Sequence, residues 1–429
     1  MEARFEKRDF NPGEYMVAAF DVSKAKLNWY TEEPSAAGRI VEREGLMANR
    51  TGVIRKHVEG LLEMSARHGR RLLVVCESTG GYERSLLRTA RSLGAQTCYV
   101  SGEATHKLTV VESNDTGKND PKDARVIYRV AMLRTALLTH RQDDPGYERL
   151  RELNAIYEDE DTLLVQVRNQ VCGILQKLFC DFSFGNDVAL GKTGRAFFVL
   201  YGLNPYRAAA AGQPTFLRSM KSALPRVRAE TLRRLWEDVE SSVRLIQAPA
   251  LVAILEARIA ELMAAFDRHS AGKEAIRKQM VSIYQRLPEY GRLTATGVND
   301  FALARVVAET GAFDGYRSWR ALLRLAGLNL KAKSSGKKVG RPSISKKGRP
   351  LLRKVLYQIA FSVLTQGSGP FADYYRERRK EPNPTPAKKL YVNVMRRFLK
   401  ALLGAYRQGR FIMDRLFLDE VNYARKKAA

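Results

Sequence analysis

The chain has 429 residues, a length that favours two or three folded domains over one. Hydrophobic residues make up 45% and charged residues 28%, which is typical of a globular protein and excludes a disordered or fibrous chain. The formal net charge of +27 indicates a polyanionic partner, with nucleic acid ahead of an anionic membrane surface.

The first 145 residues predict a mixed α/β fold. Short apolar stretches predict strands, and apolar side chains at helical spacing predict helices. In chain order they give strands at 15–22, 26–31, 39–44, 71–76 and 96–100 and helices at 51–68, 79–93 and 122–138. The order βββαβαβα is that of an RNase H-like (ribonuclease H-like) fold, a mixed sheet with helices on its faces.

The rest of the chain predicts helices. Residues 147–182 and 249–281 favour two long helices that pair as coiled-coil arms, with a basic helix around 226–244 between them. Residues 287–311 predict helix, turn and helix with Gly291 and Gly297; this is either a DNA-gripping helix-hairpin-helix or a plain αα-hairpin. Amphipathic helices at 351–365 and 388–407 close the chain.

These elements predict an α/β plus α protein with four regions. They are the RNase H-like domain at 1–145, the arms at 146–282 with an insertion at 183–247, a helix-hairpin-helix and serine-loop domain at 283–370, and C-terminal basic helices at 371–429.

Four carboxylates occupy positions that suit a metal site. Asp21 ends the first predicted strand in FDVSKAK and Glu77 ends the fourth in VCESTGGY, and these two ends are adjacent in an RNase H-like sheet. Asp120 and Asp123 in KNDPKDA lie on one face of a helix that starts near Asp120. Clustered carboxylates repel one another unless a hard cation such as Mg²⁺ binds them, and two ions about 4 Å apart can position a phosphodiester for cleavage. The alternative is that the acids form turns and cap helices.

A basic run covers residues 331–354, KAKSSGKKVGRPSISKKGRPLLRK, and contains no acid. Its apolar flanks favour an ordered loop on a scaffold over a disordered linker. The cations expected to contact nucleic acid are Lys333, Lys337, Lys338, Arg341, Lys346, Lys347 and Arg349.

The same run contains Ser334, Ser335, Ser343 and Ser345. Surrounding cations can stabilise a serine alkoxide and hold the phosphate that it attacks. Ser335 precedes Gly336, whose backbone freedom allows close approach to DNA. The alternative for each serine is a hydrogen bond to a phosphate.

The sequence does not indicate disulfides, a zinc site, a membrane span or a signal peptide. Cys76, Cys98, Cys172 and Cys180 show no CxxC spacing, so we expect reduced core cysteines and neither a disulfide framework nor a zinc site. No apolar run reaches the roughly 20 residues of a membrane span, and the charged N-terminus is unlike a signal peptide. We therefore expect a cytoplasmic protein.

The chain resembles the DEDD-type insertion-sequence transposases, which are related to the pilin-gene invertases. The resemblance rests on six motifs in the family's order: FDVSKAK, ESTGGYE, KNDPKDA, LPEYGRLTA, LAGLNLKAKSSGKK and SISKKGRPLLRKVLYQIA. It implies that Asp21, Glu77, Asp120 and Asp123 bind Mg²⁺. It also implies a nucleophilic serine at Ser335, with Ser334 as the alternative.

The resemblance implies partners as well. It implies a transient link between the serine and a DNA phosphate, by which a mobile element is excised and inserted. It further implies a structured noncoding guide RNA that pairs with donor and target DNA, and a homodimer that assembles into a homotetramer through the coiled-coil arms. A cytoplasmic, nucleoid-associated protein of a bacterium or archaeon follows from it.

Two other functions are compatible with the residues. A metal-dependent hydrolytic junction nuclease would use only the four acids and would not need Ser335. A noncatalytic DNA- or RNA-binding protein would use the acids structurally. The chain also departs from the family's pattern at Asn329, Leu330 and Lys331, where an arginine is common, and in the length of residues 183–247.

Overall fold

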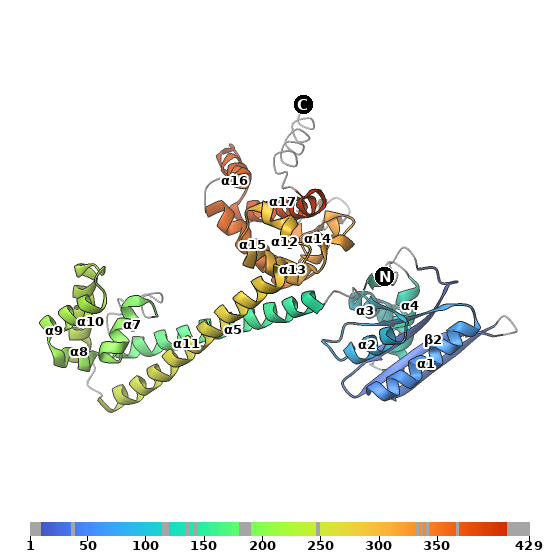
Figure 1. The fold of residues 1–429 in the computed structure, drawn as a ribbon, viewed down its shortest axis with the longest axis horizontal. Coiled ribbons are helices and arrows are strands. Elements are labelled where there is room, and N and C mark those ends of the chain that lie inside the picture. Colours follow the sequence, from blue (N-terminus) through green and yellow to red (C-terminus); the bar gives the residue numbers. More distant parts are fainter. Residues whose placement is uncertain are drawn as a thin grey trace. The chain divides into compact units, whose positions relative to one another are not determined.

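The computed structural model describes residues 10–35, 39–113, 120–133, 137–139, 145–179, 190–245, 249–331, 334–335, 338–339, 343–365 and 369–409. The chain divides into two compact units, Met1–Gln142 and Asp143–Ala429 (Figure 1).

The N-terminal unit is built on a mixed sheet that has six strands within the described residues, in the order β3-β2-β1-β4-β5-β6. Strands β1 to β3 form an antiparallel meander, β4 and β5 run parallel to β1, and β6 runs antiparallel to β5. The elements are β1 (Tyr15–Val22), β2 (Lys26–Pro34), β3 (Ile40–Ala48), α1 (Thr51–Arg67), β4 (Arg71–Cys76), α2 (Arg84–Ser92), β5 (Gln96–Val100), α3 (Gly102–Ser113), α4 (Asp120–Met132) and β6 (Leu137–Thr139).

Helices cover both faces of this sheet. Alternate side chains of a strand point to opposite faces. Val17 and Ala19 of β1 pack in one hydrophobic cluster with α4, whereas Ala18 and Phe20 pack in a second cluster with α1 and α2. Burial on both sides explains why β1 and β4 are continuous apolar runs.

The structure corrects the predicted elements at three places. The helix predicted over 122–138 ends at Met132, and Leu137–Thr139 instead form β6, because this short apolar segment pairs with the edge of β5. The helix predicted from residue 79 begins at Arg84, after a turn. Helix α3 is an addition that the sequence pattern does not predict.

The C-terminal unit is mostly helical, and its two longest helices are α5 (Pro145–Leu178) and α11 (Pro249–Tyr284), which pack against each other (Figure 1). The insertion between them is more helical than its sequence predicts. Its described part consists of α7 (Lys192–Tyr201), α8 (Pro205–Ala211), α9 (Gln213–Ala223) and α10 (Ala229–Leu245). These helices share a hydrophobic core with one end of each arm, through residues such as Leu175, Phe197 and Ile259.

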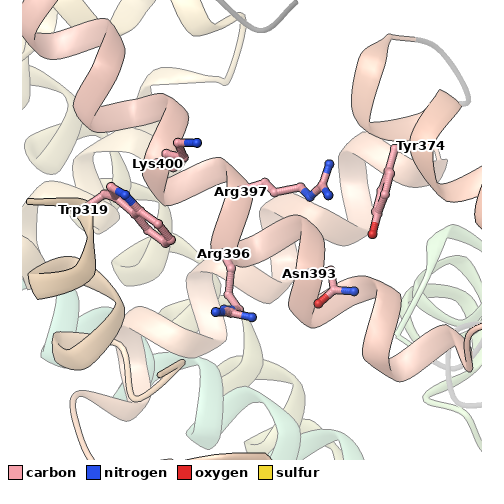
Figure 2. A pocket seen from close by; sticks show the side chains of 6 residues that line it. All are labelled: Trp319, Tyr374, Asn393, Arg396, Arg397 and Lys400. Atoms are coloured by element: carbon pink, nitrogen blue, oxygen red, sulfur yellow. The ribbon is translucent and has the colours of Figure 1, made fainter. Parts of the chain in front are cut away.

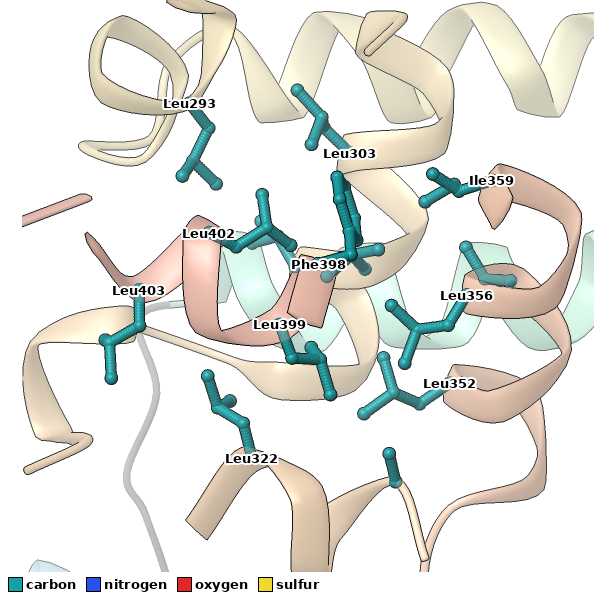
Figure 3. Packing of buried hydrophobic residues seen from close by; sticks show 14 of the residues in the cluster. Leu293, Leu303, Leu322, Leu352, Leu356, Ile359, Phe398, Leu399, Leu402 and Leu403 are labelled. Carbon is teal, nitrogen blue, oxygen red and sulfur yellow. The ribbon is translucent and has the colours of Figure 1, made fainter. Parts of the chain in front are cut away.

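The remaining helices surround a second core at the other end of the arms. They are α12 (Tyr290–Leu293), α13 (Asp300–Thr310), α14 (Trp319–Leu325), α15 (Pro350–Thr365), α16 (Pro370–Lys380) and α17 (Ala387–Gln408). Figure 3 shows Leu303 of α13, Leu322 of α14, Leu356 of α15 and Leu399 of α17 within this one cluster. Helices α16 and α17, from the predicted region 371–429, therefore share a core with α13 to α15.

Arg305 of α13 is a charged side chain inside this core, with 4% of its surface exposed. Its Nε donates to Oδ1 of Asn154 and its Nη1 to Oε1 of Gln358, each at 2.9 Å. Its Nη2 pairs with the carboxylate of Glu158. Asn154 and Glu158 belong to α5 and Gln358 to α15, so one guanidinium joins three helices. A buried charge is tolerated only when it is paired in this way.

None of the helices in the described parts of the chain is long and apolar enough to cross a membrane. Cys76, Cys98 and Cys172 are buried and form no disulfide, as predicted, and Cys180 lies outside the described residues.

Replacing Arg305 by methionine tests the buried network. The change removes the guanidinium that pairs with Glu158 and bonds to Asn154 and Gln358, so we expect the C-terminal unit to lose about 3–5 kcal/mol of unfolding free energy. Urea unfolding followed by circular dichroism measures the loss. Arg324→Met, at an exposed position of α14, is the control and should change the unfolding midpoint little. Equal midpoints for the two variants would contradict the role of the network.

Candidate functional site

Asp21 and Glu77 lie side by side at the ends of two central strands. Strands β1 and β4 are parallel neighbours, and Phe20 pairs with Cys76 in their register. The next residue on each strand is the acid, so the two backbones are about 5 Å apart there. Both carboxylate residues are half-buried. The sheet thus brings the first two predicted site residues together.

Both acids lie on the face of the sheet that α3 and α4 cover. Asp21 follows Val17 and Ala19 in the alternation of β1, and these two residues pack with α4. The carboxylate of Glu77 lies against the start of α3, since a Cβ added to Gly102 would be 3.4 Å from Oε2 of Glu77. A carboxylate is favoured at this end of a helix, where the amide N–H groups point outward.

The second pair of acids begins α4. This helix starts at Asp120, and Asp123 lies half-buried in its first turn. Helical spacing puts position 123 in line with Ile127, which is buried against the sheet. The side chain of Asp120 lies outside the described residues. Asp123 is therefore on the side of α4 that packs toward the sheet face on which Asp21 and Glu77 lie.

The donor chemistry of these positions suits a hard cation, because all four side chains are carboxylates. Among the side chains that the structure describes, no three His, Cys, Asp or Glu residues lie close enough together to share a metal ion. The structure therefore brings Asp21 and Glu77 together, but it does not bring Asp123 close enough to these two acids to form a group of three ligands.

Glu83 shapes the turn after Glu77, and the sequence analysis did not single it out. Its carboxylate, only 4% exposed, accepts hydrogen bonds from Oγ1 of Thr79 and from the amide of Gly81, both at 2.9 Å. It also accepts from the hydroxyl of Tyr99 on β5 at 3.3 Å. The second glutamate of ESTGGYE thus closes the turn that holds Glu77 at the strand end. An acid just after a Gly-Gly turn is the signal that could have identified it.

These contacts change the pKa of Glu83. Burial raises the pKa of the carboxyl, but the hydrogen bonds from its own amide, from Thr79 and from Gly81 outweigh burial and hold it below the ordinary value for glutamate. Because the folded pKa is the lower one, the stabilisation is complete above the unfolded pKa of about 4.3. It is lost as the pH falls through the folded pKa.

Glu83→Gln should therefore lower the melting temperature at neutral pH by a few degrees. The amide cannot accept the same set of charge-assisted bonds. The variant should also show a smaller loss of stability than wild type as the pH falls from about 5 to about 3. Thermal unfolding at a series of pH values measures both effects, with the exposed Glu63→Gln on α1 as control. Parallel pH curves for Glu83→Gln and wild type would show that Glu83 contributes no such stabilisation.

The two ends of the basic run are joined to each other. Strands β7 (Leu330–Lys331) and β10 (Ser343–Ile344) pair antiparallel. Ser345 donates its amide to the Asn329 carbonyl at 2.8 Å, and its hydroxyl donates to Oδ1 of Asn329 at 2.6 Å. The hydroxyl of Ser345 is thus engaged in closing the loop at its base.

Ser335 lies in a second short ladder within this loop. Strand β8 (Ser334–Ser335) pairs antiparallel with β9 (Lys338–Val339), and Ser335 is directly opposite Lys338. Both candidate nucleophiles and one predicted phosphate-binding lysine are therefore on one hairpin. The side chains of these four residues lie outside the described ones.

The other predicted nucleic-acid contacts differ in their surroundings. Lys333, Lys337 and Arg341 lie outside the described residues. Lys346 and Lys347 are exposed beyond β10, where a phosphate could reach them. Arg349 donates from Nη1 to the carbonyl of Glu309 at 2.6 Å, so this guanidinium ties the end of the loop to α13.

Gly348 allows the end of the loop to pack directly on α14. Its φ of 146° is rare for residues with a side chain, and an added Cβ would lie 2.3 Å from the carbonyl oxygen of Leu325. The adjacent Arg349 amide donates to that same carbonyl at 2.7 Å. Close backbone contact thus fixes where the loop returns to the scaffold.

Gly348→Ala should destabilise the C-terminal unit by at least about 1 kcal/mol, because the methyl group forces the two backbones apart. Gly173→Ala on α5 is the matched control. A Cβ there meets nothing within 4 Å, so the helix should gain up to about 1 kcal/mol. Thermal unfolding of both variants gives the comparison. A Gly348→Ala protein as stable as wild type would refute the close packing.

The predicted helix-hairpin-helix is shorter than its sequence suggests. Its first helix, α12, has four residues and contains Gly291, and a 3₁₀ turn at Thr294–Thr296 follows. Gly297, with φ of 70°, forms the turn, and the Asn299 side chain caps α13 by accepting from the amide of Ala302 at 2.8 Å. Gly297 is thus in the turn and Gly291 is not.

Comparisons with known proteins match both units. A family of transposases, the DEDD type of IS110, matches residues 21–180, which contain all four acids. The family described as "Transposase IS116/IS110/IS902 family" matches residues 293–376, which contain the basic loop. Together the two stretches cover more than half of the chain. The insertion element IS110 uncharacterized 43.6 kDa protein of Streptomyces coelicolor is 21% identical over 361 residues, covering 82% of this chain and 86% of the relative.

Proposed function

Because the chain belongs to the IS110-type DEDD transposases, we propose that it cuts and rejoins DNA strands through a covalent intermediate on Ser335. As a transposase it acts on DNA. The observation that carries the proposal is the hairpin of β8 and β9, which pairs Ser335 with Lys338 inside a loop whose ends are fixed to the scaffold.

The chemistry at Ser335 is a phosphoryl transfer without net hydrolysis. Its hydroxyl oxygen forms a bond to the DNA phosphorus, and the phosphorus loses its bond to one deoxyribose oxygen. That oxygen leaves as a hydroxyl and carries the proton that the serine releases. A hydroxyl of another DNA end then attacks the serine phosphodiester and frees the serine. The cations of the basic loop stabilise the negative charge that develops on the phosphate.

We propose that the acids of the N-terminal unit take part in cleavage of the same DNA. The strand order and the side-by-side placement of Asp21 and Glu77 support an RNase H-like fold with a metal site. We assign Asp21, Glu77, Asp120 and Asp123 as the residues that would hold Mg²⁺. A bound Mg²⁺ ion supplies charge that stabilises a phosphodiester in its transition state.

The remaining assignments come from the family. We propose that a structured noncoding RNA guides the protein to donor and target DNA. A homodimer would pair into a homotetramer, with α5 and α11 acting as coiled-coil arms. The regions 1–145, 146–282, 283–370 and 371–429 would then be the metal domain, the arms, the serine-loop domain and the C-terminal basic helices.

A covalent protein–DNA adduct is the expected product when the protein is incubated with element-end DNA, the flanking transcript and Mg²⁺. A denaturing gel should show the adduct with wild type and with Ser343→Ala, a matched control in the same loop. Ser335→Ala should reduce it at least about 100-fold, because removal of a nucleophile abolishes the covalent step. Asp21→Asn should reduce strand cleavage through loss of the metal.

The outcomes separate the candidate mechanisms. If Ser334→Ala removes the adduct and Ser335→Ala does not, the nucleophile is Ser334. DNA that both serine variants cleave without any adduct would refute the serine mechanism and identify a metal-dependent hydrolytic nuclease that uses the four acids alone.

A further inference from the structure

A cavity of about 170 Å³ lies beside α17, and the described residues that line it do not belong to the basic loop. Its lining residues are Trp319, Tyr374, Asn393, Arg396, Arg397 and Lys400 (Figure 2). The cavity is several times larger than the roughly 30 Å³ of one water molecule in the liquid. Three of these six side chains are cations and none is an acid.

The lining residues on α17 form one polar stripe, and the packing of the helix fixes its direction. Asn393, Arg396, Arg397 and Lys400 follow one another at helical spacing, so they form one stripe along α17. The opposite side of the same helix is apolar, and Phe398 and Leu402 pack in the core. The core therefore fixes the rotation of α17 and directs the polar stripe at the cavity.

Two aromatic rings orient the cations at opposite ends of the cavity. The guanidinium carbon of Arg397 lies 4.0 Å from the centre of the Tyr374 ring, and Nζ of Lys400 lies 5.8 Å from the centre of the Trp319 ring (Figure 2). Tyr374 is 4% exposed, so its ring is a fixed platform. A guanidinium stacked on a fixed ring loses little freedom when its planar N–H groups bind a phosphate.

We propose that this cavity binds a phosphodiester group of a nucleic-acid backbone, at a site separate from the serine loop. Arg396 and Lys400 are four residues apart on one helix and both line the cavity, so one phosphate could contact both cations. The paired N–H groups of an arginine guanidinium match the spacing of two phosphate oxygens, and Asn393 adds an amide donor. A nucleobase or ribose next to the phosphate would contact Trp319.

The position of the cavity in the fold favours the binding of a nucleic-acid strand that also reaches the serine loop. Trp319 is the first residue of α14, and the basic run follows the other end of this helix. A seven-residue helix spans about 10 Å, which is about three nucleotides of one strand. This relation to the reacting phosphate rests on the proposed function, whereas phosphate binding by the cavity does not.

Equilibrium binding without cleavage tests the site. Fluorescently labelled single-stranded DNA, single-stranded RNA and duplex DNA are titrated with the full-length protein at several salt concentrations, and anisotropy gives Kd. We expect Arg397→Gln to raise Kd about tenfold for at least one of these probes. The slope of log Kd against log salt concentration should fall by about 0.9 for duplex DNA or by about 0.7 for a single strand. This is the change expected when one phosphate contact is lost.

The control removes the same charge from a neighbouring helix. Arg376 of α16 is exposed and paired with Asp373, so Arg376→Gln should change Kd less than about twofold. Arg397→Lys keeps the charge and should retain most of the salt slope while losing part of the affinity. Circular dichroism melting of each variant verifies that the fold is retained.

The probe that responds identifies the source of the phosphate. A loss confined to duplex or single-stranded DNA assigns the cavity to the DNA substrate, and a loss confined to RNA assigns it to an RNA partner. Equal losses for Arg397→Gln and Arg376→Gln would reduce the effect to general electrostatics and overturn the proposal, as would unchanged binding of all three probes. Because no cleavage is measured, these outcomes do not depend on whether Ser335 is the nucleophile.

Discussion

The pairing of the buried Arg305 guanidinium fixes the C-terminal unit, because it joins the arm helix α5 to α13 and α15. The same connection continues to the basic loop. Asn154 of α5 donates to the Glu309 carboxylate at 2.9 Å, and the Glu309 carbonyl accepts from Arg349 at the end of the loop. An unpaired charge inside a core costs several kcal/mol, so these helices hold one arrangement. The loop that carries Ser335 is therefore attached to a rigid base.

In the N-terminal unit the corresponding constraint is the parallel pairing of β1 with β4. The register sets Asp21 beside Glu77, because the two residues follow the paired positions Phe20 and Cys76. Glu83 then determines the path of the chain after Glu77, because its carboxylate accepts the hydrogen bonds that the turn residues donate. A strand pair and one buried acid are thus enough to bring two distant parts of the sequence to the same sheet end.

The cations of the chain are of three kinds that composition does not distinguish. Some cations are structural: Arg305 is bonded within the core, and Arg353 donates to the Ala326 carbonyl at 3.0 Å. Others, such as Lys346 and Lys347, are exposed next to the serine loop. The stripe of α17 is a third kind, in which aromatic rings orient cations around a cavity. The proposed nucleic-acid contacts are thus distributed over more than one surface.

The sequence by itself determined the α/β then helical order, the two long arms, and the residues Asp21, Glu77 and Ser335 as candidates, because these depend on local periodicity and on side-chain chemistry. Only the tertiary structure decided that residues 137–139 form a strand, that Glu83 closes the turn after Glu77, and that Trp319 meets Arg397 and Lys400 at one cavity. The cavity joins residues far apart in the chain, the strand depends on an edge that β5 leaves open, and Glu83 also bonds to Tyr99 of another strand. Periodicity within one segment carries no information about such partners.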